Sequence, residues 1–314
     1  MNIKDFYKKG IEMGIDADFR SNEYVAKLLE RRKVKAEKLS GRHKDEFDAE
    51  SLENPYADSR ILHVAEDKNV TKILAGIDIE SAEIMLAKDL GVDLVVAHHP
   101  MGRALGDLHE VMELQADILE QYGVPINVGE GMLKERISEV ERGFNPRNLW
   151  KTLDVAKLIN VNVMCFHTAS DNIAAKVVTE KLDKAKPERV EDIMDALKEI
   201  PEYQEAIARG VGPKIFAGVA ENRCGKILVD MTGGTEGPPK LYEKLSQAGV
   251  GTIVGMHISE EHKKEADAAN INIVIAGHMS SDSIGMNIIL DEAEKQGVEI
   301  ISCGGLFRVS RNTQ

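Results

Sequence analysis

Three histidine motifs follow apolar stretches of the sequence, and two of them place an aspartate four residues after the histidine. The motifs are AHHP at 97–100, FHTASD at 166–171 and GHMSSD at 277–282. In sheets of parallel strands, ligands bind beyond the carboxyl ends of the strands, so polar groups at these points are the first candidates for chemistry. Imidazole and carboxylate groups are ligands of divalent metals. The pattern therefore favours a metal site to which both halves of the chain contribute.

Each motif also has an interpretation without a metal. Asp171 and Asp282 stand at the start of predicted helices, where an aspartate commonly caps the first N–H groups. His167 alone fits a hydrogen-bonded histidine at the end of a sheet. The pair His98-His99 fits that interpretation less well, because two adjacent imidazoles after a buried strand have several nitrogens to satisfy away from water. Pro100 ends the strand, so that the two rings can converge.

Hydrophobic periodicity predicts the elements that position these motifs. Strands are expected at 70–80, 92–100, 124–129 and 161–171 before the proline-containing stretch 187–212, and at 226–231, 251–258, 272–278 and 298–302 after it. Helices are expected between them, at 81–91, 106–123, 137–160, 241–249, 259–270 and 282–297. Such alternation is typical of mainly parallel sheets. We therefore expect the α/β class, with two α/β lobes and a dinuclear metal site in the cleft between them.

The domain boundaries follow from shifts in composition. Residues 1–50 are charged and helical and are interpreted as an N-terminal extension, followed by the first α/β lobe at 51–186. Residues 187–212 are interpreted as a helical insertion or linker, with prolines at 187 and 201 and a third, at 213, directly after it. The second α/β lobe spans 213–314, with C-terminal elements that are able to return to the first lobe.

Composition excludes several classes of protein. The 314 residues carry 53 acidic and 40 basic side chains, a net charge of −13 that disfavours nucleic acid as a partner. The apolar runs are too short to span a bilayer, so no membrane association is expected. Three widely spaced cysteines without a CxxC pair support neither a disulfide framework nor a zinc ribbon. Since the first residues also lack an apolar signal segment, we expect a cytoplasmic protein.

The segments VVAHHP, FHTASDN and AGHMSSD, in this order, resemble the YbgI-like family of dinuclear-metal proteins, members of which are described as type 2 GTP cyclohydrolase I. The resemblance extends from about residue 71 to the C-terminus. It implies that the metal ligands are His98, His99, Asp171, His278 and Asp282, with His167 as an additional histidine at the same site. The family usually has Glu at the position of Asp282 and an acid at that of Met256, whereas His262 is retained.

The resemblance implies a metal-dependent hydrolase that binds two divalent ions, such as Fe, Zn or Mn, and acts on a small polar or nucleotide-like substrate. Asp171 has two oxygens with which to bridge such ions, and paired ions lower the pKa of a water between them. His167 is the candidate proton shuttle or orienting group, and His262 lies on the expected substrate side. Arg103 is a candidate basic group for an anionic substrate. The glycine-rich loop at 232–238 could place backbone N–H groups around a phosphate, but a tight turn that enters a helix is the favoured interpretation.

Two other functions stay open at this point. The chain could handle metal ions, as a chaperone does, without turning over a substrate, because similar sites serve different functions. It could also be a regulatory interaction protein that uses its charged N-terminal helices. Members of the resembled family commonly assemble into ring-like hexamers, so the resemblance implies a homo-oligomer.

Overall fold

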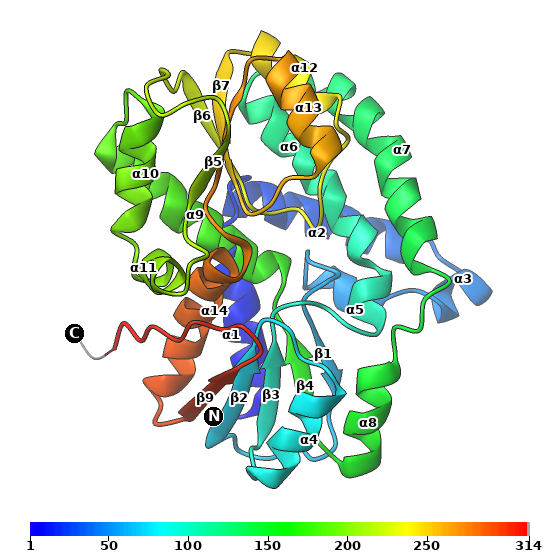
Figure 1. Ribbon diagram of the computed structural model, residues 1–314. Coiled ribbons are helices and arrows are strands. Elements are labelled where there is room, and N and C mark those ends of the chain that lie inside the picture. The colour runs from blue at the N-terminus through cyan, green and yellow to red at the C-terminus, as the bar shows by residue number, and fades with distance from the viewer. Residues whose placement is uncertain (313–314) are drawn as a thin grey trace.

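Two β-sheets organise the computed structural model, which describes residues 1–312, and each forms the centre of one lobe (Figure 1). The first sheet has the strand order β1-β4-β3-β2-β9 and the second the order β5-β8-β7-β6. The edge strands β1 and β5 run antiparallel to their neighbours, and the other strand pairs of residues 1–312 are parallel. The expected α/β class with two lobes and mainly parallel sheets is therefore confirmed.

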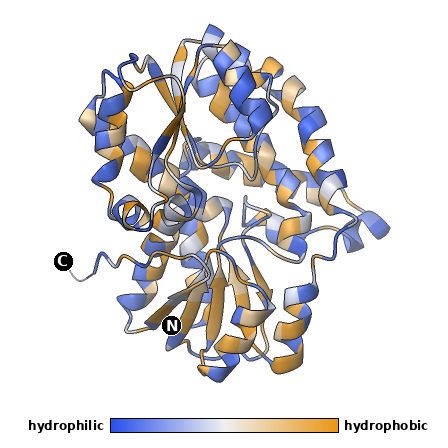
Figure 2. Ribbon diagram, viewed as in Figure 1, coloured by the Kyte–Doolittle hydropathy of each residue, from blue (hydrophilic) through white to orange (hydrophobic). Residues whose placement is uncertain are grey.

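The first sheet contains β1 (Arg60–His63), β2 (Lys72–Gly76), β3 (Leu94–Ala97), β4 (Val163–Cys165) and β9 (Glu299–Cys303). Its central strands are almost wholly apolar, as Figure 2 shows, because helices cover both of their faces. Alternate residues serve alternate faces: Leu74 and Val95 face α4 (Ser81–Asp89) and α8 (Lys151–Ile159), whereas Ile73 and Val96 face the opposite side. On that opposite side lie α1 (Ile3–Asp16) and α14 (His278–Glu294).

The second sheet contains β5 (Lys214–Ala217), β6 (Lys226–Asp230), β7 (Val250–Gly255) and β8 (Asn272–Ile275). One face packs on α9 (Thr168–Ala185) and α10 (Val190–Lys198), with α11 (Pro201–Ala208) beside them. The other face packs on α6 (Leu114–Gln121), α12 (Leu241–Gln247) and α13 (Glu260–Ala268). The helix α9 follows β4 of the first sheet and packs on the second sheet, so it joins the two lobes.

The C-terminal strand β9 returns to the first lobe. It pairs in parallel with β2, from Lys72 opposite Glu299 to Gly76 opposite Cys303. The helix before it, α14, leaves the second sheet and packs along α9. Both α9 and α14, which run between the two lobes, begin at a histidine motif.

Two parts of the chain differ from the sequence-based expectation. The predicted strand at 124–129 is wrong, because Pro125 precedes the first residue of α7 (Ile126–Phe144). Proline, whose φ is fixed near −65°, fits the start of a helix as well as an extended segment. The apolar pattern of the six residues 124–129 therefore does not distinguish a strand from a helix start. The stretch 1–50 is helical, but α1 is part of the core rather than peripheral, with Ile3 and Phe6 both 1% exposed.

The remaining elements are short or lie at the periphery. They are α2 (Asn22–Ala36), α3 (Arg42–Asp45), η1 (Ala49–Leu52), α5 (Arg103–Gly106) and η2 (Leu108–Glu113). Among the helices of residues 1–312, none has both the length and the apolar composition that a bilayer crossing requires.

Candidate metal centre

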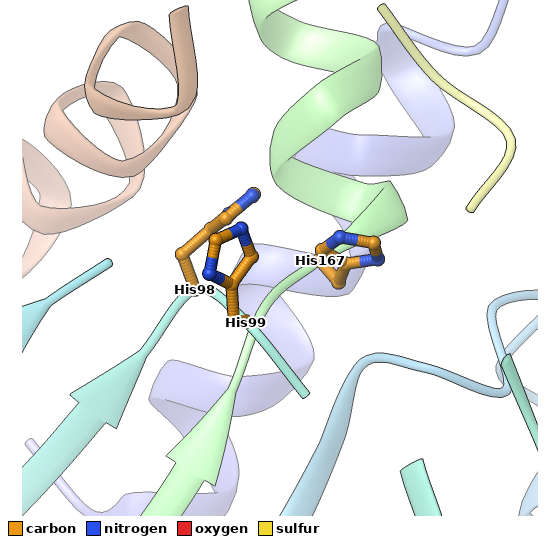
Figure 3. A group of neighbouring side chains, drawn as sticks. All are labelled: His98, His99 and His167. Atoms are coloured by element: carbon orange, nitrogen blue, oxygen red, sulfur yellow. The ribbon is translucent and has the colours of Figure 1, made fainter. Parts of the chain in front are cut away.

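The histidine motifs meet where strands of both sheets end. His98 and His99 directly follow β3, and His167 follows β4 at the start of α9, so the three rings gather at one edge of the first sheet (Figure 3). The ring centres of His98 and His167 are 5.0 Å apart. His278, the first residue of α14, brings its ring to 5.3 Å from that of His99. The structure thus brings together four histidines that the sequence places in three separate motifs.

Asp171 and Asp282 lie in the first turns of α9 and α14 and reach the same cluster. The His98 Nε2 atom is 3.4 Å from Asp171 Oδ1 and 3.5 Å from Asp282 Oδ1. On the other side of Asp282, Oδ2 lies 3.6 Å from His99 Nε2 and 3.5 Å from His278 Nε2. His167 Nε2 is 4.0 Å from Asp171 Oδ2. Asp282 therefore faces histidines with both of its oxygens.

These carboxylates lack the hydrogen bonds that burial normally requires. Asp282 is 0% exposed and Asp171 5% exposed, yet both Asp282 oxygens and Asp171 Oδ1 find no donor within residues 1–312. Neither α9 nor α14 has a side-chain hydrogen bond at its N-cap, so the aspartates are not helix caps. Buried carboxylates without partners are costly unless a cation compensates them. The residues present therefore fit a divalent metal.

The other ring nitrogens are fixed by acceptors around the cluster. Nδ1 of His98 donates to the Phe166 carbonyl over 3.0 Å, and Nδ1 of His99 lies 2.6 Å from Asp78 Oδ1. Nδ1 of His167 lies 2.8 Å from Asp58 Oδ2. An acceptor at Nδ1 fixes the tautomer and leaves the Nε2 lone pair free for a metal. All three rings accordingly present Nε2 to the aspartates.

The side chains of the cluster differ in the direction in which their pKa values are shifted. Burial, followed by the neighbouring imidazoles, lowers the pKa of His98 well below its usual value and that of His278 to about 4. Burial raises the pKa of Asp282 well above its usual value and that of Asp171 to about 7. For His167, burial is outweighed by Asp171 and Asp58, which raise the pKa to about 9. Neutral His98 and His278 are in the form that binds metal.

Asp58 and Asp78 are site residues that sequence reasoning missed. Asp78 stands two residues after β2, so an acid at a strand end was the available signal. Asp58 lies in a loop before β1 and is fully buried beside His167, and its sequence context carries no such signal.

A cavity of about 360 Å³ extends from this cluster to the second lobe. His262 lines it, but its ring connects two segments of the wall: Nδ1 lies 2.6 Å from Ser259 Oγ, and Nε2 donates to the Gly237 carbonyl over 2.9 Å. Sequence reasoning missed His257, which follows β7 and brings its ring to 5.1 Å from that of His278.

Two sequence interpretations of the surroundings need correction. Among residues 1–312, those that line the cavity do not include Arg103, which pairs with Asp107 over 2.9 Å. The loop at 232–238 is more than a turn, because residues 232 and 234–237 line the cavity. Gln115 Nε2 holds this loop by donating to the carbonyls of Gly233 and Thr235, over 2.7 and 2.6 Å.

No family model matches the chain, and no curated protein matches its sequence. Among solved structures, a NIF3 superfamily protein from Sphaerobacter thermophilus is 28% identical, with a TM-score of 0.73 over 80% of this chain and 92% of that one. Reduced HcgD from Methanocaldococcus jannaschii is 17% identical, with a TM-score of 0.49 over 79% and 93%. The protein YbgI is 14% identical, with a TM-score of 0.48 over 90% and 97%.

The fold and the cluster together define a two-lobed α/β protein with a candidate metal centre between its lobes. The structure has the fold of the NIF3 superfamily, and the resemblance to the YbgI-like family predicted from the histidine motifs is thereby confirmed.

Proposed function

We propose that this protein binds two divalent metal ions and uses them to hydrolyse a small polar substrate. The observation that carries the proposal is the pair of buried carboxylates without donors, surrounded by the Nε2 atoms of four histidines. Three overlapping sets of side chains offer ligand atoms within 4.8 Å of one another. They are His98, Asp171 and Asp282; His99, His278 and Asp282; and His98, His99 and His167.

Asp282 is the residue best suited to serve both ions. It belongs to two of the three sets, with Oδ1 toward His98 and Oδ2 toward His99 and His278. Of the four histidines, all within residues 1–312, Asp171 lies near only His98 and His167. The bridging role that sequence reasoning gave to Asp171 is therefore better filled by Asp282, and we propose Asp171 as a ligand on the side of His98.

Hydrolysis is favoured over storage of metal because the cluster opens into a cavity of about 360 Å³, which is the size of a small-molecule site. When bound, two divalent ions supply Lewis acidity for attack by water. His167, oriented by Asp58, is placed to hold or pass a proton next to Asp171. A chaperone that exchanges ions rapidly would be poorly served by His98 and Asp282, which are 1% and 0% exposed.

Metal content tests the proposal. Protein purified without chelator should carry close to two ions per chain, and His98→Ala should lose them, whereas His43→Ala, on an exposed histidine, should retain them. The loaded protein is then assayed against phosphoesters, cyclic amides and nucleotides. Turnover that requires metal and disappears in Asp171→Asn supports the hydrolase. If the wild type holds no ion and regains none on reconstitution, or if ions pass rapidly to an acceptor without turnover, the proposal is wrong.

A further inference from the structure

The wall that the second lobe contributes to the cavity is acidic. Asp230, the last residue of β6, and Glu236, in the loop that follows, both line it. Within residues 1–312, no lysine or arginine lines this cavity. Protein sites for phosphate or carboxylate groups typically supply arginine, lysine or a cluster of backbone N–H groups. The charge of this wall therefore opposes an anion.

The two carboxylates differ in how much of their hydrogen-bonding capacity is free. Glu236 Oε1 lies 2.9 Å from His257 Nδ1 and accepts from the Ser259 N–H over 3.2 Å, and the hydrogen bond from His257 lowers the pKa of Glu236. Asp230 makes no side-chain hydrogen bond or ion pair with residues 1–312, and it is exposed while lining the cavity. Asp230 is thus the available acceptor, with Glu236 adding negative charge beside it.

The cavity lining also has an apolar part. It is formed by Leu105, Phe144, Ile253, Ile273 and Ile275, beside polar residues such as Thr232 and His257. These side chains can accommodate an apolar portion of a ligand that binds in the cavity. Burial, followed by the neighbouring Asp230 and Glu236, raises the pKa of the Tyr242 hydroxyl, so this group remains a neutral donor and acceptor.

We propose that the substrate of this site carries a cationic or N–H-rich group, such as an amine or amidine, that binds to Asp230 on the second lobe. The inference rests on the proposed function, since the reacting end of the same molecule lies at the metal cluster. A nucleoside triphosphate would place further negative charge near Asp230 and Glu236, where like charges repel. The proposal thereby narrows the substrate class from polar or nucleotide-like molecules to molecules that carry an amine, an amidine or another N–H-rich group.

Three hydroxamic acids of equal chain length test this assignment on zinc-loaded protein by calorimetry. They share a metal-binding head and end in an ammonium, a methyl or a carboxylate group. We expect the ammonium compound to bind about tenfold more tightly than the methyl compound, and the carboxylate compound about tenfold more weakly, for a partly desolvated charge pair. In Asp230→Asn the advantage of the ammonium compound should largely disappear, while the affinity of the methyl compound stays unchanged.

Asp89→Asn is the matched control, because this exposed aspartate ends α4 at the opposite end of the first sheet. It should preserve the order of the three affinities. If the carboxylate compound binds as tightly as the ammonium compound, or if Asp230→Asn keeps the ammonium preference, the assignment is wrong.

Failure of the metal site gives a different result. If none of the three compounds binds more tightly to the wild type than to His98→Ala, the proposed metal centre is wrong. The charge preference is then measured with hexylamine and hexanoate, which require no metal. Hexylamine should shift the resonances of residues around Asp230, and hexanoate should not; equal shifts would overturn the assignment.

Discussion

A β-carbon added to Gly285 would lie 2.1 Å from the carbonyl oxygen of Ser170, so the two residues mark a backbone-to-backbone crossing of α14 and α9. Each residue is a near neighbour of a cluster aspartate, Asp282 on α14 and Asp171 on α9. The close crossing brings both carboxylates to within 3.5 Å of His98 Nε2. One glycine thus allows two helices that are far apart in the sequence to complete the candidate metal centre.

Gly285→Ala should therefore damage both stability and metal binding. Since the added methyl meets backbone rather than a flexible side chain, we expect the free energy of unfolding to fall by about 1–3 kcal/mol, as in other overpacked cores. Metal content per chain should fall with it. Urea unfolding and metal analysis measure the two effects.

Gly131→Ala is the control for that substitution, because a β-carbon at this position of α7 has no atom within 4 Å. Alanine is favoured over glycine inside a helix by about 0.5–1 kcal/mol, so this variant should be slightly more stable and keep its metal. Equal stability and metal content in the two variants would argue against the helix crossing as the determinant of the site.

Asp282→Asn should separate stability from metal binding. In the absence of metal, a buried carboxylate without donors destabilises the fold, so the neutral amide should raise the free energy of unfolding of metal-free protein by about 1–3 kcal/mol. The same variant should lose metal because Asp282 faces three histidines. Thermal unfolding with and without chelator measures both effects. A metal-free variant less stable than wild type would show that Asp282 has a structural role instead.

Asp58→Asn should weaken metal binding more than Asp78→Asn does. Asp58 is fully buried and orients His167, and loss of such a partner typically lowers metal affinity about 10–100-fold. The side chain of Asp78 is 62% exposed, so water can replace its contact with His99. Competition with a chromophoric chelator measures both affinities. Equal losses would mean that burial of the outer partner does not control the site.

Asp93→Asn should lower stability in a pH-dependent manner. Asp93 Oδ2 accepts from the Thr71 N–H over 2.8 Å, and Lys68 Nζ lies 2.8 Å from Oδ1. Burial would raise the pKa of Asp93, but Lys68, Thr71 and Lys72 lower it to about 2. A depressed carboxylate pKa stabilises the folded state above the unfolded value of about 4, and this contribution is lost as the pH falls toward the folded value.

The loss in Asp93→Asn should accordingly be about 1–2 kcal/mol at pH 7, as for hydrogen bonds to a charged group, and it should shrink as the pH is lowered from about 4 to about 2. Denaturant unfolding of wild type and variant across this range measures the difference. A gap that stays constant with pH would show that the carboxylate charge contributes nothing.

Much of the architecture was predictable because it is encoded locally. Apolar runs such as that of β3 identify buried parallel strands, and the alternation of such runs with helices predicts the α/β class. The failures occur where local patterns are ambiguous. Pro125 suits an extended segment and a helix start alike, and the periodicity of α1 shows one apolar face without showing which surface covers it.

The sequence by itself determined which histidines and aspartates stand at strand ends and helix starts, because those positions follow from short-range periodicity and motif spacing. Only the tertiary structure decided that Asp282 has histidines on both sides, that Asp58 supports His167, and that Asp230 remains free on the opposite wall. Such relations depend on how α9 and α14 cross and how two sheets face one another. They arise from packing between segments far apart in the chain, which no local pattern of residues encodes.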